Sequence, residues 1–348
     1  MIEKYYSGVI EQIYNRIGKE TRNIVMANYS NDFSIENLEV IRRYQSNEDN
    51  VFFAYSEFSY NTLIGAYEPF LDIICNMHRR FIGGSFDDFQ KECGVYYLHR
   101  QVLNSYYETG ECFREEMVLL NEVAYEQRRM TMAIADMLKR LSEVKPLMIV
   151  INRFQMASKS SIETIKYLID NPCANIGIVL GVNALVKGAD STLEVWDSIV
   201  ESLEDRSAVY YIGSAGQLKN TVKTTNDDEM YITMNFEQSI QEASNIMEFL
   251  DFEQAKRGCR IIEHKLKFED AWIDEKSLRR FYMVYARTSV LLGEMSKAIE
   301  LTNEFKALIP ENDSEHYLSL YYFMKGTCYM YQGKLEKAGN SAKSAYDY

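Results

Sequence analysis

The chain has 348 residues, of which 47% are hydrophobic and 26% are charged, a composition typical of a globular protein with one large or two medium domains. Its formal net charge of −13 argues against binding to nucleic acid or to an anionic membrane, because phosphate contacts require clustered lysine and arginine. No apolar run approaches the length of about 18 residues that a membrane span needs. The six cysteines form no CxxC pair, which indicates free thiols, and we expect a protein of the reducing cytoplasm.

The N-terminal part of the chain predicts a helix followed by a strand–helix–strand unit. Apolar residues recur at helical spacing over residues 1–20, and short apolar runs at 23–27 and 51–55 predict two strands. Ser34 is a typical N-cap for the helix between these strands. Such an order is that of a βαβ unit. From about Glu111 onward the pattern predicts a long charged helix.

The middle of the chain is organised around the run Leu147–Ile151, which is apolar at every position. A strand without polar alternation is typical of a parallel sheet that is buried on both faces. Further buried strands are predicted at 176–180 and 208–212, with amphipathic helices between them. We therefore predict an α/β fold in which Leu147–Ile151 lies inside a parallel sheet, next to 23–27 or 176–180.

Polar residues follow this strand at the edge of the sheet where ligands bind. In open α/β sheets, ligands bind beyond the carboxyl ends of the strands, and Asn152 and Arg153 occupy that position. An enzyme that hydrolyses a nucleotide needs an acid there to hold Mg²⁺. Because an amide and a cation stand in its place, the sequence predicts a domain that does not catalyse hydrolysis.

After about residue 235 the strand pattern ends and a helical repeat begins. The stretches 250–255, 292–298 and 332–338 resemble one another and recur at intervals of about 43 and 40 residues, which is typical of stacked helical hairpins. Unrelated amphipathic helices are the alternative interpretation. The pattern ends inside a helix without a polar cap, as in a solenoid that continues.

The second and third stretches resemble tetratricopeptide repeats in the placement of their large, small and turn residues. These residues are Tyr282, Tyr285, Ala286, Gly293, Ala298 and Pro310 in one unit and Tyr322, Gly326, Tyr329, Gly333, Ala338 and Ala345 in the next. The resemblance implies that Ala298 and Ala338 lie where two helices cross, close to Tyr282 and Tyr322. It also implies that Lys297 is exposed.

Residues 1–215 resemble the ATPase module of the STAND regulators, AAA-related P-loop proteins that often precede tetratricopeptide repeats. Tyr67–Phe70 follows the Tyr-x-Pro-Phe pattern of that family. Val150–Ser158 corresponds to its Walker B region, in which Gln155 and Ala157 agree with the pattern. The order and spacing of the predicted elements also fit this family.

The motifs that bind and hydrolyse ATP in that family are degraded in this chain. A working phosphate loop reads GxxxxGK[ST], whereas here Asp32 replaces the second glycine and Phe33 replaces the lysine. The two Walker B acids are also replaced. The resemblance therefore implies a degenerate nucleotide site at Ala27, Asp32, Phe33, Ser34, Asn152 and Arg153. We expect no catalytic residue and no bound cofactor, and the scattered histidines predict no metal site.

The predicted architecture is an α/β, parallel P-loop NTPase-like sheet domain over residues 1–235 followed by an all-α, tetratricopeptide-like helical-repeat domain over 236–348. We expect a non-catalytic pseudo-ATPase scaffold or regulator whose repeats bind a protein or peptide partner, without direct contact to nucleic acid or membrane. Formation of a homo-oligomer is left open. One alternative is a signalling switch that holds ATP through backbone N–H groups at the Ser34 helix start with little hydrolysis. The other is an enzyme with an unfamiliar site at the switch point of the sheet.

Overall fold

The computed structural model describes residues 2–29, 38–46, 50–59, 63–114, 118–183, 186–187, 192–212, 223–224, 235–268, 273–311 and 314–348. The chain divides into two compact units. Unit 1 comprises Met1–Gly110 and Arg128–Glu229, and unit 2 comprises Glu111–Gln127 and Met230–Tyr348. Residues 111–127, which the sequence pattern left in the first domain, therefore belong to unit 2.

Unit 1 is built on an all-parallel sheet with five strands in the described residues. Its strands are β1 (Ile24–Tyr29), β2 (Phe52–Glu57), β3 (Leu147–Asn152), β4 (Ile176–Asn183) and β6 (Val209–Ile212). They lie in the order β2-β3-β4-β1-β6. Two short strands, β5 (Val186–Lys187) and β7 (Lys223–Thr224), pair separately. The predicted α/β class with a parallel sheet is confirmed.

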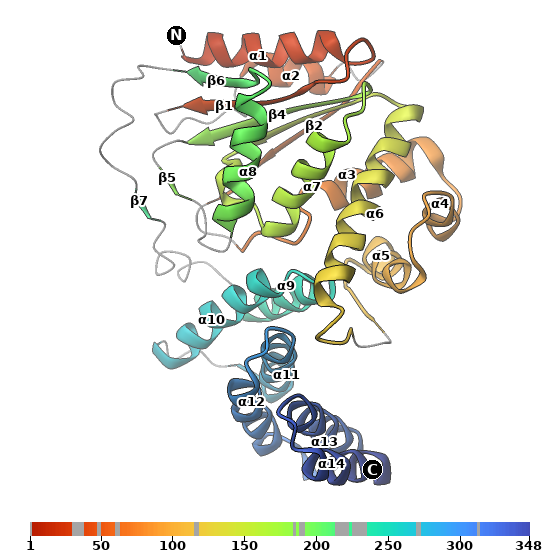
Figure 1. Ribbon diagram of the computed structural model, residues 1–348, viewed down its shortest axis with the longest axis vertical. Coiled ribbons are helices and arrows are strands. Elements are labelled where there is room, and N and C mark those ends of the chain that lie inside the picture. The colour runs from red at the N-terminus through yellow and green to blue at the C-terminus, as the bar shows by residue number, and fades with distance from the viewer. Residues whose placement is uncertain are drawn as a thin grey trace. The chain divides into compact units, whose positions relative to one another are not determined.

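Helices cover both faces of this sheet (Figure 1). The helices that lie wholly in unit 1 are α1 (Ile2–Arg16), α2 (Glu39–Ser46), α3 (Phe70–Met77), α4 (Phe86–Glu92), α5 (Tyr97–Thr109), α7 (Lys159–Asp170) and α8 (Leu193–Glu204). The long helix α6 (Val123–Val144) precedes β3. A π-helical turn (His78–Ile82) follows α3, and a 3-10 turn (Phe154–Met156) follows β3.

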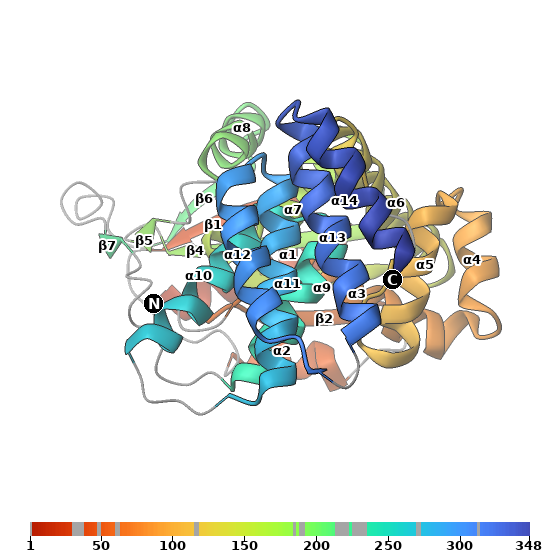
Figure 2. The same ribbon diagram turned by 90° about the horizontal axis from the view of Figure 1, so that it is seen from below.

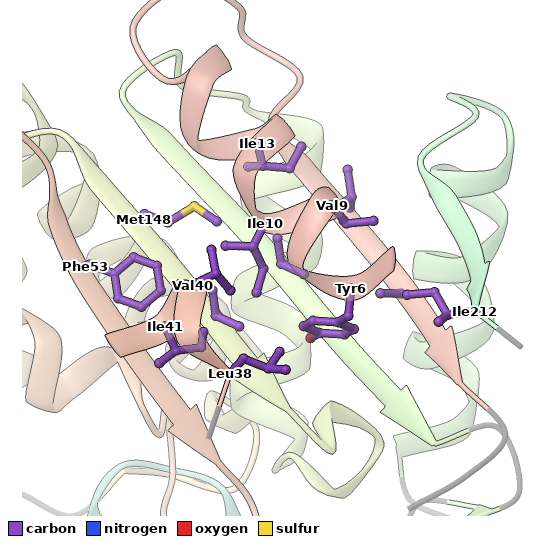
Figure 3. Close-up of a cluster of buried hydrophobic side chains, with 14 of the residues drawn as sticks. Tyr6, Val9, Ile10, Ile13, Leu38, Val40, Ile41, Phe53, Met148 and Ile212 are labelled. Atoms are coloured by element: carbon purple, nitrogen blue, oxygen red, sulfur yellow. The ribbon is translucent and has the colours of Figure 1, made fainter. Parts of the chain in front are cut away.

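An apolar core lies between α1, α2 and one face of the sheet (Figure 3). Tyr6, Ile10 and Ile13 of α1 are fully buried and recur at a spacing of four and three residues, so one side of the helix faces the strands. Gly177 of β4 permits this close approach, because a Cβ atom there would lie 2.9 Å from Ile13 Cγ2. The core therefore depends on a helix that rests directly on the strand backbone.

The strand β3 is buried along its whole length, as its unbroken apolar sequence predicted. Leu147–Ile151 have no exposed surface. Ile149 lies opposite Ala54 of β2 on one side and opposite Ile178 of β4 on the other. The prediction that this strand is interior and pairs with the strand at 176–180 is confirmed.

Two predicted boundaries are wrong. The first strand, predicted at 23–27, continues through Asn28 to Tyr29, because Tyr29 is buried and pairs with Asn183 of β4. The predicted long charged helix forms but does not begin at Glu111, because the described residues among 111–122 are not helical. α5 ends at Gly110, whose φ of 74° is a left-handed C-cap, and α6 begins only at residue 123.

Unit 2 contains three consecutive helix pairs in its described residues (Figures 1 and 2). The helices are α9 (Phe236–Glu248), α10 (Phe252–Phe268), α11 (Glu275–Leu291), α12 (Met295–Ala307), α13 (Ser314–Tyr331) and α14 (Leu335–Asp347). The first helices of the pairs contact one another in turn, and the second helix of each pair contacts the first helix of the next pair. Each pair thus buries the apolar side of its neighbour, as in a solenoid.

Small residues lie at the helix crossings of these pairs. Ala298 is fully buried, and the Ala338 carbonyl oxygen lies 3.5 Å from the position that a Cβ atom on Gly326 would occupy. The expectation that Lys297 is exposed is wrong. Its side chain is half-buried, and its Nζ lies 3.2 Å from Glu263 Oε1 of α10, so an ion pair between neighbouring hairpins covers it.

Candidate functional site

The first candidate site is the carboxyl edge of the sheet, centred on Asn152 at the end of β3. The Asn152 side chain is fully buried, and its Oδ1 accepts hydrogen bonds from the Tyr29 hydroxyl at 2.5 Å and from the Arg153 backbone N–H at 3.0 Å. A backbone N–H can only donate, so the amide oxygen is the atom that faces it. Asn152 Nδ2 is left buried without a partner among the described residues.

Arg153 carries the positive charge of this edge. Its φ of 56° lies in the left-handed region, which is strained for a residue with a side chain. Its Nη1 lies 3.2 Å from Glu57 Oε1 at the end of β2 and donates to the Phe58 carbonyl oxygen at 3.4 Å. The sequence placed Asn152 and Arg153 at this edge, whereas only the structure adds their partners Tyr29 and Glu57.

A second amide extends this edge toward β4. Gln155 lies in the 3-10 turn after β3, and its Oε1 accepts a hydrogen bond from the Asn183 backbone N–H at 3.3 Å. Its Nε2 is buried and has no partner in the part of the chain that the structure describes. Both amides at this edge therefore have occupied oxygens and spare N–H donors.

This arrangement opposes the binding of a divalent cation. Mg²⁺ takes oxygen ligands in near-octahedral geometry. The Asn152 oxygen already accepts two hydrogen bonds, and the groups with spare capacity are N–H donors beside a guanidinium group. Within the described ranges, no group of three or more His, Cys, Asp or Glu side chains could hold a metal ion.

The Tyr-x-Pro-Phe stretch contacts the start of α7, just after the region that corresponds to Walker B. The Tyr67 backbone N–H donates to Ser160 Oγ at 3.0 Å, and the Ser161 hydroxyl donates to the Glu68 carbonyl oxygen at 2.8 Å. Burial raises the pKa of the Glu68 carboxyl group, although a hydrogen bond from the Gly65 N–H opposes this effect. The two hydroxyl groups hold the segment before α3 against the start of α7, which is a structural role.

Of the remaining positions of the degenerate nucleotide site, the structure describes Ala27 alone. Ala27 is a fully buried residue inside β1, two positions before the strand ends at Tyr29. Asp32, Phe33 and Ser34 lie outside the described residues. Of the six predicted positions, Asn152 and Arg153 are those that the structure brings together at the carboxyl edge.

The second candidate site lies in unit 2, where a non-helical segment of the chain contacts the helix pairs. The segment is residues 111–122, of which 111–114 and 118–122 are described. The Cys112 backbone N–H donates to Asn245 Oδ1 of α9 at 2.9 Å, and the Leu120 backbone N–H donates to the Tyr331 hydroxyl of α13 at 2.9 Å. Side chains from two helix pairs thus hold backbone N–H groups of one non-helical segment.

A buried ion cluster fixes this segment to α9. Arg114 and Glu248 have side chains that are 2% and 6% exposed, with Arg114 Nε 3.8 Å from Glu248 Oε2. Arg114 Nη2 also donates to the Glu248 carbonyl oxygen at 3.1 Å. On the other side of Glu248, Arg287 Nη1 of α11 lies 2.8 Å from Oε1. Burial lowers the pKa of Arg114, but the facing Glu248 opposes this effect, and the guanidinium group remains charged.

The sequence did not predict this second site. Residues 111–122 mix cysteine, phenylalanine and valine with an arginine, and their pattern predicted a helix rather than a segment held by other helices. The deciding contacts join residues 133 and 211 positions apart. Gln127 adds one more, because its Nε2 donates to the Leu250 carbonyl oxygen at 2.6 Å. No local pattern predicts such contacts.

Comparisons with known proteins assign no family. No protein-family model matches this chain, and no curated protein gives a significant sequence match. Across the described residues, no helix combines the length and the apolar character that crossing a bilayer requires. Evidence of function therefore comes from the two sites themselves.

Proposed function

We propose that this protein is a non-catalytic scaffold or regulator, in which a degenerate P-loop-like domain accompanies tetratricopeptide-like repeats that bind an extended segment of a protein partner. The observation that carries this proposal is the segment 111–122 on α9 and α13. Its backbone N–H groups and one buried arginine are held by side chains of the helix pairs. A surface that holds the backbone of one non-helical segment in this way has the chemistry to hold another.

The carboxyl edge of the sheet supports the non-catalytic part of the proposal. Phosphoryl transfer depends on Mg²⁺ and on groups that neutralise developing negative charge. Asn152 has its oxygen occupied by two donors, and the charge of Arg153 is paired with Glu57. The strand order β2-β3-β4-β1-β6, with β1 between β4 and β6, supports the resemblance to AAA-related P-loop proteins.

The binding part is tested with a synthetic peptide of residues 111–122 added to the full chain carrying Arg114→Ala. This substitution weakens the hold on the internal segment, and we expect the labelled peptide to bind with a Kd below about 100 μM, roughly −5.5 kcal/mol. A peptide with alanine in place of its arginine is the matched control and should bind at least about tenfold more weakly. Absence of binding by the native peptide contradicts the proposal.

The non-catalytic part is tested by calorimetric titration with ATP and Mg²⁺. We expect no binding with a Kd at or below about 10 μM, roughly −7 kcal/mol. Tighter binding without turnover would favour a nucleotide-binding switch instead. Magnesium-dependent release of phosphate, abolished by substitution of Asn152, would show that the domain is an enzyme.

A further inference from the structure

A cavity of about 210 Å³ lies at the amino-terminal edge of the sheet, opposite the carboxyl edge that holds Asn152. Three arginines line it from separate elements, namely Arg16 in the last turn of α1, Arg22 before β1 and Arg206 between α8 and β6. Glu20 is the single acid among its described lining residues. The lining therefore carries net positive charge in a chain whose net charge is −13, which favours an anionic ligand.

The arginines of this cavity differ in how far their charges are already paired. Arg16 Nε lies 3.6 Å from Glu20 Oε2, so this pair is partly neutralised. Arg206 Nη1 donates to the Ile169 carbonyl oxygen at 2.6 Å, which orients its guanidinium group without neutralising it. Arg22 is exposed and makes no ion pair or hydrogen bond with the described residues. Arg22 and Arg206 thus keep the charge and the donors that an anion needs.

A buried acceptor accompanies these donors. Asn23 is fully buried, and its Nδ2 donates to the carbonyl oxygens of Glu20 at 2.6 Å and Ala174 at 3.1 Å. These bonds fix the turn between α1 and β1. They also identify the other atom as Oδ1, which is buried without a donor in the described part of the chain. A buried acceptor without a donor is costly, so a ligand hydroxyl that donates to it is stabilised.

We propose that this cavity binds a small phosphate monoester that carries a hydroxyl group. The phosphate would be held by Arg22 and Arg206, which suit its oxygens because guanidinium groups bind phosphate through two parallel hydrogen bonds. The hydroxyl group would donate to Asn23 Oδ1. Leu168 and Leu203 form part of the apolar wall, which strengthens charge interactions by excluding water. The volume is below the roughly 300–1,000 Å³ of sites for drug-sized ligands, so a nucleoside triphosphate is too large.

Calorimetric titration of the full chain with glycerol 3-phosphate at low ionic strength tests this site. We expect Arg22→Gln to weaken binding at least about tenfold, because it removes charge-assisted hydrogen bonds. We expect Glu20→Gln to strengthen binding roughly threefold or more, because it removes the single acid and frees Arg16. Arg280→Gln on the exposed side of α11 removes the same charge elsewhere and should change the Kd less than about twofold.

Several outcomes would overturn the assignment. If glycerol 3-phosphate does not bind at millimolar concentration, the proposed site is refuted. Equal weakening by Arg22→Gln and Arg280→Gln shows a general effect of net charge, and weaker binding after Glu20→Gln contradicts the electrostatic reasoning.

Methyl phosphate, which lacks an alcohol hydroxyl group, should bind more weakly than glycerol 3-phosphate. Equal affinity for the two refutes the contact with Asn23. Unchanged thermal unfolding of Arg22→Gln, as expected for an exposed side chain, shows that the variant is folded.

Discussion

Replacing Glu248 and replacing Arg114 in the buried ion cluster of unit 2 should lower the free energy of unfolding by unequal amounts. Glu248→Gln leaves the guanidinium group of Arg114, which is 2% exposed, without its paired carboxylate. An uncompensated partner of a buried ion pair costs about 3–5 kcal/mol. Glu126 also attracts Arg114 electrostatically, so we expect a loss near the lower end, about 3 kcal/mol.

The opposite substitution, Arg114→Met, should cost less. Glu248 keeps Arg287 Nη1 at 2.8 Å from its Oε1, so its charge stays paired. Methionine also retains much of the apolar bulk of the arginine stem. The loss is mainly that of the hydrogen bond to the Glu248 carbonyl oxygen, about 1–2 kcal/mol. When both residues are replaced, no uncompensated charge is left at position 114. The loss in free energy of unfolding of the double variant should therefore be smaller than the sum of the two single losses by at least about 1 kcal/mol.

Native-state hydrogen exchange measures these losses locally, at the amides of Cys112 and Leu120, which donate to unit 2 side chains. A loss of 3 kcal/mol accelerates exchange roughly 150-fold, whereas a loss of 1.5 kcal/mol accelerates it roughly 12-fold. The exposed Glu304→Gln is the matched control and should leave both amides unchanged. Equal acceleration by Glu248→Gln and Arg114→Met, or the reverse order, refutes the reasoning.

Three further predictions concern the packing and the pH dependence of the two units. Ala298→Leu should overpack a helix crossing and lower the free energy of unfolding by about 1–3 kcal/mol, whereas Asn303→Leu on the exposed side of the same helix should cost under about 0.5 kcal/mol in urea titrations. Ile149→Asp places an unpaired charge in the interior strand β3 and should cost several kcal/mol, so a variant with wild-type circular dichroism and melting temperature would contradict the position of β3. Partial burial raises the pKa of Glu263, but hydrogen bonds from Lys297 and a second lysine outweigh it, so the pKa lies below its ordinary value of 4.5. The stabilisation is therefore present above pH 4.5 and is lost as pH falls through the lowered pKa, and Glu263→Gln should flatten the urea midpoint between pH 6 and pH 3.

Local patterns were sufficient to predict the elements of the sheet. Leu147–Ile151 is apolar at every position, and an unbroken apolar run of this length is typical of a strand that is buried on both faces. The same reasoning located the other strands of the sheet, and the recurring stretches 250–255, 292–298 and 332–338 located the helix pairs, with a turn glycine in the second and third. Gly293 and Gly333 both adopt positive φ, of 78° and 72°, which glycine accommodates without strain. Asn152 and Arg153 were placed at the carboxyl edge because strand ends follow directly from strand positions.

By itself, therefore, the sequence determined where the strands of the main sheet and the helix pairs lie, that the sheet is parallel, and which residue types follow its central strand. The tertiary structure alone decided which atoms of those residues remain available. It turned the oxygen of Asn152 toward Tyr29, covered Lys297 with Glu263, and bound Cys112 and Leu120 to α9 and α13 where the local pattern favoured a helix. The physical reason is the range of the interactions: periodicity reports which side of one element is apolar, whereas hydrogen bonds and ion pairs join residues far apart in the chain and override a weak local preference.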